Sequence, residues 1–158
     1  MRQISKIIFH CSATKEGVDI SAATVRSWHI LPKSKGGPGF ADIGYHYFVR
    51  LDGKIEKGRA DAVPGAHVEG HNSNSIGICY AGGLDANGKP KDTRTPAQRR
   101  ALRALADSLT RQYPGAEIHS HWEYAAKACP CFDAGKEYID LQPPHYREAV
   151  EKRKEFQK

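Results

Sequence analysis

Residues that could do chemistry gather in one short stretch of the chain, Ile118–Asp133, which reads IHSHWEYAAKACPCFD. It holds two histidines, one lysine and two cysteines. Ile118–His121 has the composition of a strand end, and Pro130 interrupts any helix in the residues that follow. A strand end followed by a loop is a usual place for reactive side chains, because a rigid scaffold positions them while the loop leaves access.

A histidine near the amino terminus could complete a metal site with this stretch. His10 ends the β-rich run KIIFH, and two imidazoles and a thiolate, from His10, His121 and Cys129, are suitable ligands for zinc. Three protein ligands leave one position open for water, as in a catalytic site, whereas a structural site would normally have four. Zinc lowers the pKa of bound water to about 7, so hydroxide would be available at neutral pH.

Taken alone, each of these residues also has an ordinary structural role. His10 could be a hydrogen-bonded histidine at a strand end, and Cys129 could be a buried apolar side chain. Lys127 could be a solvated loop cation, and Tyr45 could be a packing aromatic of a sheet. The residue types and their spacing leave these alternatives open.

The elements that must position these side chains alternate between strands and helices. Short β-rich runs predict strands at Lys6–His10, Tyr45–Leu51, Lys54–Lys57, Ser75–Tyr80 and Glu117–His121. Helices are predicted from Asp19 or Ser21, from Thr95 and from Pro144, the last with a frayed end. Strands interleaved with helices, plus a hairpin turn at Asp52-Gly53, predict an α/β domain with a mixed central sheet flanked by helices.

Two of the helices have a recognisable buried face. Thr95-Pro96-Ala97-Gln98 is a strong helix start, with a threonine cap, proline at the first position and glutamine at the third. The buried stripe that follows is predicted to comprise Leu102, Leu105, Ala106, Leu109 and Tyr113. In the first helix, the apolar face is predicted to comprise Ala22, Val25, Trp28 and His29.

Length and composition indicate one globular domain. The chain has 158 residues, of which 39% are apolar, enough for a core. We expect a single domain over residues 1–158, with its core at about 5–140 and a charged C-terminal extension. The apolar run Ile7–Phe9 is too short for a signal peptide, and nothing downstream could span a bilayer, so we expect synthesis in the cytoplasm. Without an export signal, disulfides are not expected among the four cysteines.

The formal net charge of +6 suits either a basic surface or attraction to an anionic polymer, such as nucleic acid or bacterial cell wall. The basic residues are scattered, with no arginine-rich arm and no interleaved aromatic platform, so nucleic acid is not expected as a partner.

Five motifs occur in order along the chain: FHCSAT at 9–14, DIGYHYFVRLDG at 42–53, GAHVEGHNSNSIGI at 65–78, TPAQ at 95–98 and KACPCFD at 127–133. Together they resemble the type 2 N-acetylmuramoyl-L-alanine amidases, which include the phage amidase-type lysozymes and the peptidoglycan recognition proteins. The resemblance spans about Lys6–Asp133, and the phage lysozymes look most similar. It implies the fold of this family.

The resemblance also assigns roles to individual residues. It implies that one zinc ion is bound by His10, His121 and Cys129, with Tyr45 and Lys127 as catalytic residues. His67 and Asn72 lie in the loop that lines the glycan-peptide groove of relatives, which suggests contact with substrate. For Asn72, stabilisation of a turn is an alternative role.

Three choices stay open at this point. Alternation along a strand places His119 and His121 on the same face, and His121 is preferred for its spacing to Cys129. Cys131 stands where the family commonly has a small or polar residue, so the identity of the ligating thiolate is open. Glu123 is either an acceptor that orients a ligand imidazole or an ordinary loop carboxylate.

The resulting hypothesis is a monomeric zinc amidase that hydrolyses the bond between N-acetylmuramic acid and L-alanine in peptidoglycan or muropeptides. The alternative is a peptidoglycan-binding recognition module without catalysis, although such relatives usually lack the cysteine ligand. A nucleic-acid-binding or polymerase-binding regulator with a structural zinc is a third hypothesis. Lysis by a phage or prophage, wall recycling and attack on competitors all fit, so the enzyme is expected to act on the cell wall, or on cytoplasmic fragments if it recycles them.

Overall fold

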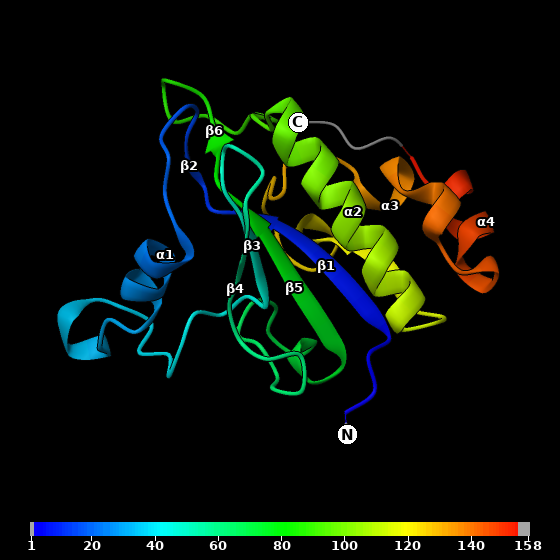
Figure 1. Ribbon diagram of the computed structural model, residues 1–158, viewed down its shortest axis with the longest axis horizontal. Helices are drawn as coiled ribbons and strands as arrows, with labels where there is room; N and C mark the ends of the chain where they lie inside the picture. The colour runs from blue at the N-terminus through cyan, green and yellow to red at the C-terminus, as the bar shows by residue number, and fades with distance from the viewer. Residues whose placement is uncertain (1, 155–158) are drawn as a thin grey trace.

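A computed structural model of the chain describes residues 2–154 and is built around a mixed five-stranded sheet (Figure 1). In the order β4-β3-β5-β1-β7, its strands are Ile55–Lys57, Tyr47–Val49, Ser75–Tyr80, Lys6–Cys11 and Glu117–Ser120. The β3–β4 pair is antiparallel and the other pairs are parallel. The mixed sheet predicted from the sequence is therefore confirmed.

Alternation along the interior strand β1 sends neighbouring side chains to opposite faces of the sheet. Ile7, Phe9 and Cys11 join the larger apolar cluster, which also contains residues of the long helix α2. His10 points to the other face, which carries a smaller cluster that includes Val25 and Cys79. The candidate metal ligand thus lies on the sheet face away from α2.

The helix α2, Pro96–Gln112, begins as its sequence predicts. The Thr95 side chain accepts a hydrogen bond from the Gln98 backbone N–H, and the Gln98 side chain accepts one from the Thr95 N–H. Four residues of the predicted stripe are buried, namely Leu102, Leu105, Ala106 and Leu109. The fifth, Tyr113, is partly exposed and packs against the larger apolar cluster.

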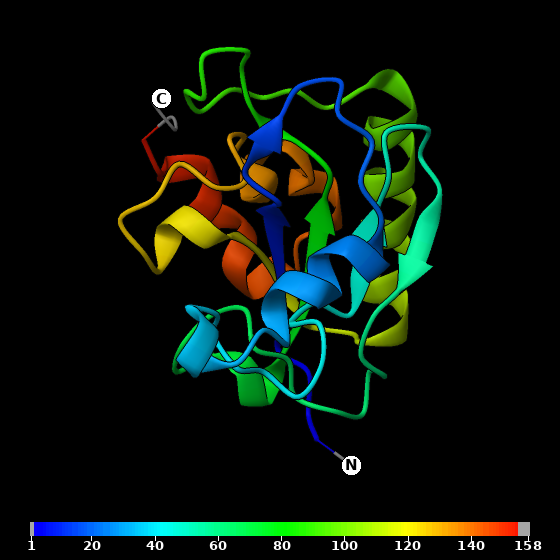
Figure 2. The ribbon, with the colours of Figure 1, turned by 90° about the vertical axis from the view of Figure 1, so that its left-hand side faces the viewer.

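The helix α1, Ala22–His29, lies in front of the strands in Figure 2. Ser21 caps it by accepting a hydrogen bond from the Thr24 N–H, as expected for a start at that serine. Val25 is buried, but Trp28 is 45% exposed, so the predicted apolar face is only partly correct. The helix ends at His29. Val25 belongs to the smaller apolar cluster beneath the helix, and Ala22 packs against that cluster.

The remaining elements are short, apart from the last helix. They are β2 (Thr14–Lys15), β6 (Gly83–Leu84), the 3₁₀ helices η1 (Lys33–Lys35), η2 (Asn72–Asn74), η3 (His121–Glu123) and η4 (Ile139–Leu141), and the helix α3 (Ala134–Glu137). The predicted C-terminal helix is α4, Pro144–Lys152, whose Val150 is fully buried. The fraying predicted at the chain end lies outside the described residues. No helix within residues 2–154 combines the length and apolar character needed to cross a bilayer.

Candidate metal centre

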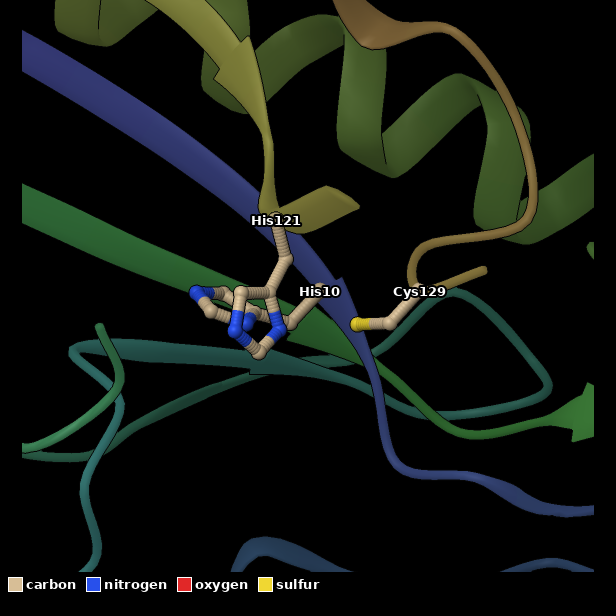
Figure 3. A group of neighbouring side chains, drawn as sticks. All are labelled: His10, His121 and Cys129. Atoms are coloured by element: carbon tan, nitrogen blue, oxygen red, sulfur yellow. The ribbon is translucent and has the colours of Figure 1, made fainter. Parts of the chain in front are cut away.

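Three side chains from separate segments point toward one another beside β1 (Figure 3). His10 comes from the end of β1, His121 from the residue after β7, and Cys129 from the loop that follows. One ligand atom from each residue lies within 4.8 Å of the others. Among residues 2–154, this is the only group of at least three histidine, cysteine or acidic residues that meets this distance.

His10 is held tightly because β1 lies inside the sheet, between β5 and β7. The residue pairs with Cys79 of β5 and is 1% exposed. Its ring centroid lies 4.6 Å from that of His121 and 5.1 Å from that of Tyr45.

His121 reaches the site because the strand stops one residue before it. β7 ends at Ser120, and the 3₁₀ turn η3 begins with His121. A capping box holds that turn: the Ser120 N–H donates to Glu123 Oε2 at 2.6 Å.

The neighbouring histidine, His119, does not join the group. It is 5% exposed, and its two ring nitrogens lie 2.9 Å from carboxylate oxygens of Glu117 and Glu123. Glu123 therefore binds His119 and the backbone of Ser120, and so orders the turn that carries His121. The choice of His121 over His119 fits this geometry.

The two thiols of the ACPC segment have different surroundings. The Cys129 sulfur accepts a hydrogen bond from the Cys11 backbone N–H at 3.2 Å, and it belongs to the group with His10 and His121. Cys131 is buried, and its thiol lies 3.4 Å from the Gly83 carbonyl oxygen, to which it donates. Of these two thiols, that of Cys129 is the one placed to bind a metal.

The protonation of the two imidazoles suits metal binding. Burial lowers the pKa of His10 well below its usual value, and the nearby His67, His121 and Lys127 lower it further. Burial, assisted by the charge of Lys127, lowers the pKa of His121 to about 4. Both rings are therefore neutral at neutral pH, which is the form that binds metal. The donor set of two imidazoles and one thiol fits zinc.

Tyr45 and Lys127 flank this group. Burial, together with the nearby thiols of Cys79 and Cys129, raises the pKa of Tyr45 well above its usual value, so its phenol stays protonated. Lys127 is exposed, yet its charge acts on both ligand histidines. Tyr45 thus lies beside the candidate ligand His10, and Lys127 acts on the two candidate histidines through its charge.

His67 and Asn72 line a cavity of about 590 Å³. Its other lining residues are Lys33, Pro38, Phe40, Ala66, Val68 and Glu69. The Asn72 side-chain oxygen accepts hydrogen bonds from the backbone N–H groups of His67 and Val68, both at 3.0 Å. Asn72 thus has the turn-stabilising role that was the alternative to substrate contact.

One neighbour of Tyr45 was not singled out from the sequence as part of a site. His29 lies 5.5 Å from Tyr45 between ring centroids, and its Nδ1 accepts a hydrogen bond from the Gly44 N–H at 2.9 Å. It thereby fixes the backbone immediately before Tyr45. Its helical spacing predicted only an apolar face, and no local signal in the sequence indicates this contact.

Comparisons with known proteins identify the family to which this chain belongs. A family model described as N-acetylmuramoyl-L-alanine amidase matches residues 1–132. The endolysin of Klebsiella phage KP32 is 46% identical over 132 residues, which cover 84% of this chain and 83% of that protein. The endolysin of Escherichia phage T7 is 43% identical over 127 residues, with 80% of each sequence covered.

Solved structures share the fold. The Ph2119 endolysin from the Thermus scotoductus MAT2119 bacteriophage superposes with a TM-score of 0.69 at 26% identity, covering 90% of this chain and 87% of that one. Drosophila PGRP-LB superposes with a TM-score of 0.70 at 22% identity, covering 92% and 84%, which supports the fold alone. Because the family model covers most of the sequence and the phage endolysins align over most of their length, this chain belongs to the N-acetylmuramoyl-L-alanine amidase family.

Proposed function

We propose that this N-acetylmuramoyl-L-alanine amidase works with one zinc ion held by His10, His121 and Cys129. The observation that carries the proposal is the meeting of these three side chains within 4.8 Å, in a chain of this family. Two neutral imidazoles and a thiolate form a set of the kind that binds zinc with one position left open. The bond cleaved is the amide between N-acetylmuramic acid and the L-alanine of the stem peptide.

The bound metal would supply Lewis-acid polarisation of the amide carbonyl and activation of the attacking water. The chain's own residues supply the rest. The backbone N–H of Cys11 donates a hydrogen bond to the Cys129 sulfur and so holds that sulfur in place. The buried, central position of His10 keeps its ring in place, so little reorganisation is needed when substrate arrives.

Tyr45 and Lys127 are proposed as the catalytic side chains. The protonated phenol of Tyr45 is a hydrogen-bond donor that orients the water or transfers a proton as the bond to the leaving amine breaks. The Lys127 ammonium stabilises the negative charge that develops on the carbonyl oxygen. The exposed position of Lys127 leaves it accessible to substrate arriving from solvent.

We place the substrate along the cavity beside the metal centre, where His67 and Asn72 contribute to the wall. Lys33 and Glu69, of opposite charge, lie on the same cavity. A stem peptide carries both amine and carboxylate groups, so this lining suits it. We further propose that residues 1–158 form one catalytic domain that acts as a monomer on cell-wall peptidoglycan or on its fragments.

Digestion of purified peptidoglycan tests this proposal. We expect the protein to release stem peptides with a free N-terminal alanine, and dialysis against a chelator to stop the release until zinc is added back. Sugar reducing ends should not increase, since no glycosidic bond is cut. Binding to peptidoglycan without any new amine, in zinc and on every common wall type, would contradict the amidase and support a recognition module.

Replacing Lys127 by methionine is expected to lower kcat by about tenfold to a hundredfold, because a donor to the developing oxyanion is lost. The lower end is expected, since solvent screens an exposed charge. Zinc content should be unchanged. Lys89→Met, which removes the same charge from an exposed turn, is the control, measured by initial rates of stem-peptide release. Equal rates in the two variants would exclude Lys127 from catalysis.

A further inference from the structure

The ligand histidine His10 has a buried partner of its own. The Nε2 atom of His10 lies 2.8 Å from Nδ1 of His67, a residue 57 positions along the chain. The two rings meet edge to face, with 4.9 Å between centroids and 86° between planes. Because Nε2 is engaged in this hydrogen bond, Nδ1 is the nitrogen of His10 that remains for a metal.

His67 is itself fixed from two further directions. Its Nε2 lies 3.1 Å from the hydroxyl oxygen of Ser75, which is fully buried at the start of β5. Its backbone N–H donates to the Asn72 side chain. Both ring nitrogens of His67 are therefore used inside the protein, and only the ring's carbon face is left for the cavity that it lines.

Two glycines make the space that the His67 ring occupies. A Cβ atom at Gly77 of β5 would stand 2.7 Å from Cγ and Cδ2 of His67, and one at Gly65 would stand 2.7 Å from Cδ2. Real Cβ atoms essentially never approach so closely. Both positions therefore need glycine to leave room for the His67 ring, and at Gly65 the Gly44 carbonyl oxygen, 2.6 Å from such a Cβ, requires it as well.

We propose that His67 is a positioning residue for the metal ligand His10. In this arrangement the His10 Nε2–H donates to Nδ1 of His67, and the His67 Nε2–H donates to the Ser75 hydroxyl. This chain of donors selects the tautomer of His10 whose Nδ1 carries a lone pair toward the metal. The inference rests on the proposed zinc site and adds a role for His67 distinct from contact with substrate.

A matched pair of amide substitutions tests this role. In His67→Asn, the side-chain oxygen stands near the former Nδ1 position and still accepts from His10, whereas in His67→Gln the amide stands near the former Nε2 position. We expect His67→Gln and His67→Ala to lower zinc affinity by about 10-fold to 100-fold, and His67→Asn to retain most of it. Zinc affinity is measured by competition with a chromophoric chelator, and cobalt(II) spectra report the ligand geometry.

Kinetics at saturating zinc separate positioning from substrate contact. A positioning role predicts an unchanged KM and activity that excess zinc largely restores in His67→Gln. A substrate contact predicts a raised KM with unchanged zinc affinity in every variant, and that result would overturn the inference. Gly77→Ala keeps His67 but crowds its ring. If circular dichroism shows that the fold is retained, this variant should also bind zinc more weakly than the wild type does.

His145→Ala is the matched histidine control, because the His145 side chain is 60% exposed and pairs with Glu117. It should leave zinc affinity unchanged. If the wild type binds zinc and both His67→Asn and His67→Gln bind it as tightly as the wild type does, the positioning role is wrong, but the proposed zinc amidase function is not contradicted. If the wild type itself binds no zinc, the proposed function and this inference fall together.

Discussion

Cys129→Ser is expected to reduce kcat/KM by about a thousandfold or more, since the metal that polarises the amide is lost with its ligand. Serine still accepts a hydrogen bond from the Cys11 N–H, so the loop should keep its conformation. The neutral hydroxyl, however, is a poor substitute for a thiolate ligand. Zinc content by atomic emission and stem-peptide release from peptidoglycan are the two measurements.

Cys131→Ser is the matched control for this experiment, two residues away in the same segment. A serine hydroxyl can donate to the Gly83 carbonyl as the Cys131 thiol does, so fold, zinc and activity should all be retained. If Cys131→Ser loses zinc while Cys129→Ser keeps it, the thiol assignment is reversed. If both variants keep zinc and turnover, the metal centre proposed here is wrong.

Tyr45→Phe is expected to lower kcat by about a hundredfold, because a hydrogen-bonding and proton-transferring group is removed from beside the metal position. The phenylalanine ring keeps the contact with His10, whose centroid lies 5.1 Å away, so zinc affinity should not change. The measurement is the initial rate with soluble muropeptide at saturating concentration, together with zinc content.

Tyr47→Phe serves as the control for the loss of a phenol hydroxyl from the same part of the chain. The Tyr47 hydroxyl donates to the Asp61 carboxylate at 3.0 Å, and Tyr47 packs against the larger apolar cluster, on the sheet face opposite His10. Its removal should lower stability by about 1 kcal/mol and leave kcat unchanged. An equal fall in kcat for the two variants would show that Tyr45 acts through packing rather than chemistry.

Local signals explain which elements were predictable from the sequence. The capping box at Thr95 and the proline after it are contained in four consecutive residues, so the start of α2 followed from sequence. The strands at Lys6 and Ser75 likewise stood out as short apolar runs. The predicted strand at Glu117–His121 is one residue too long, since β7 ends at Ser120. The turn that ends it depends on the hydrogen bond from the Ser120 N–H to the Glu123 carboxylate, which the strand pattern does not indicate.

Other features depend on contacts between distant residues and were not predictable in the same way. Trp28 follows Val25 at helical spacing, yet it is exposed, because the apolar cluster under α1 is small. The two-residue strands β2 and β6 exist only as each other's partners. The hydrogen bond between His10 and His67 depends on where a loop crosses the sheet, which no local pattern encodes.

The position of β1 between β5 and β7 has a consequence for biogenesis. This strand precedes both of its neighbours, β5 and β7, in the chain, so both partners are translated much later than β1. Pairing between such distant segments gives a high contact order, so folding is expected to wait for them. A nascent polypeptide that does not yet include Cys129 lacks one of the three proposed metal ligands. Hydrolytic activity should therefore arise only after the segment that carries Cys129 has been synthesised, and products terminated before that residue should be inert toward the wall.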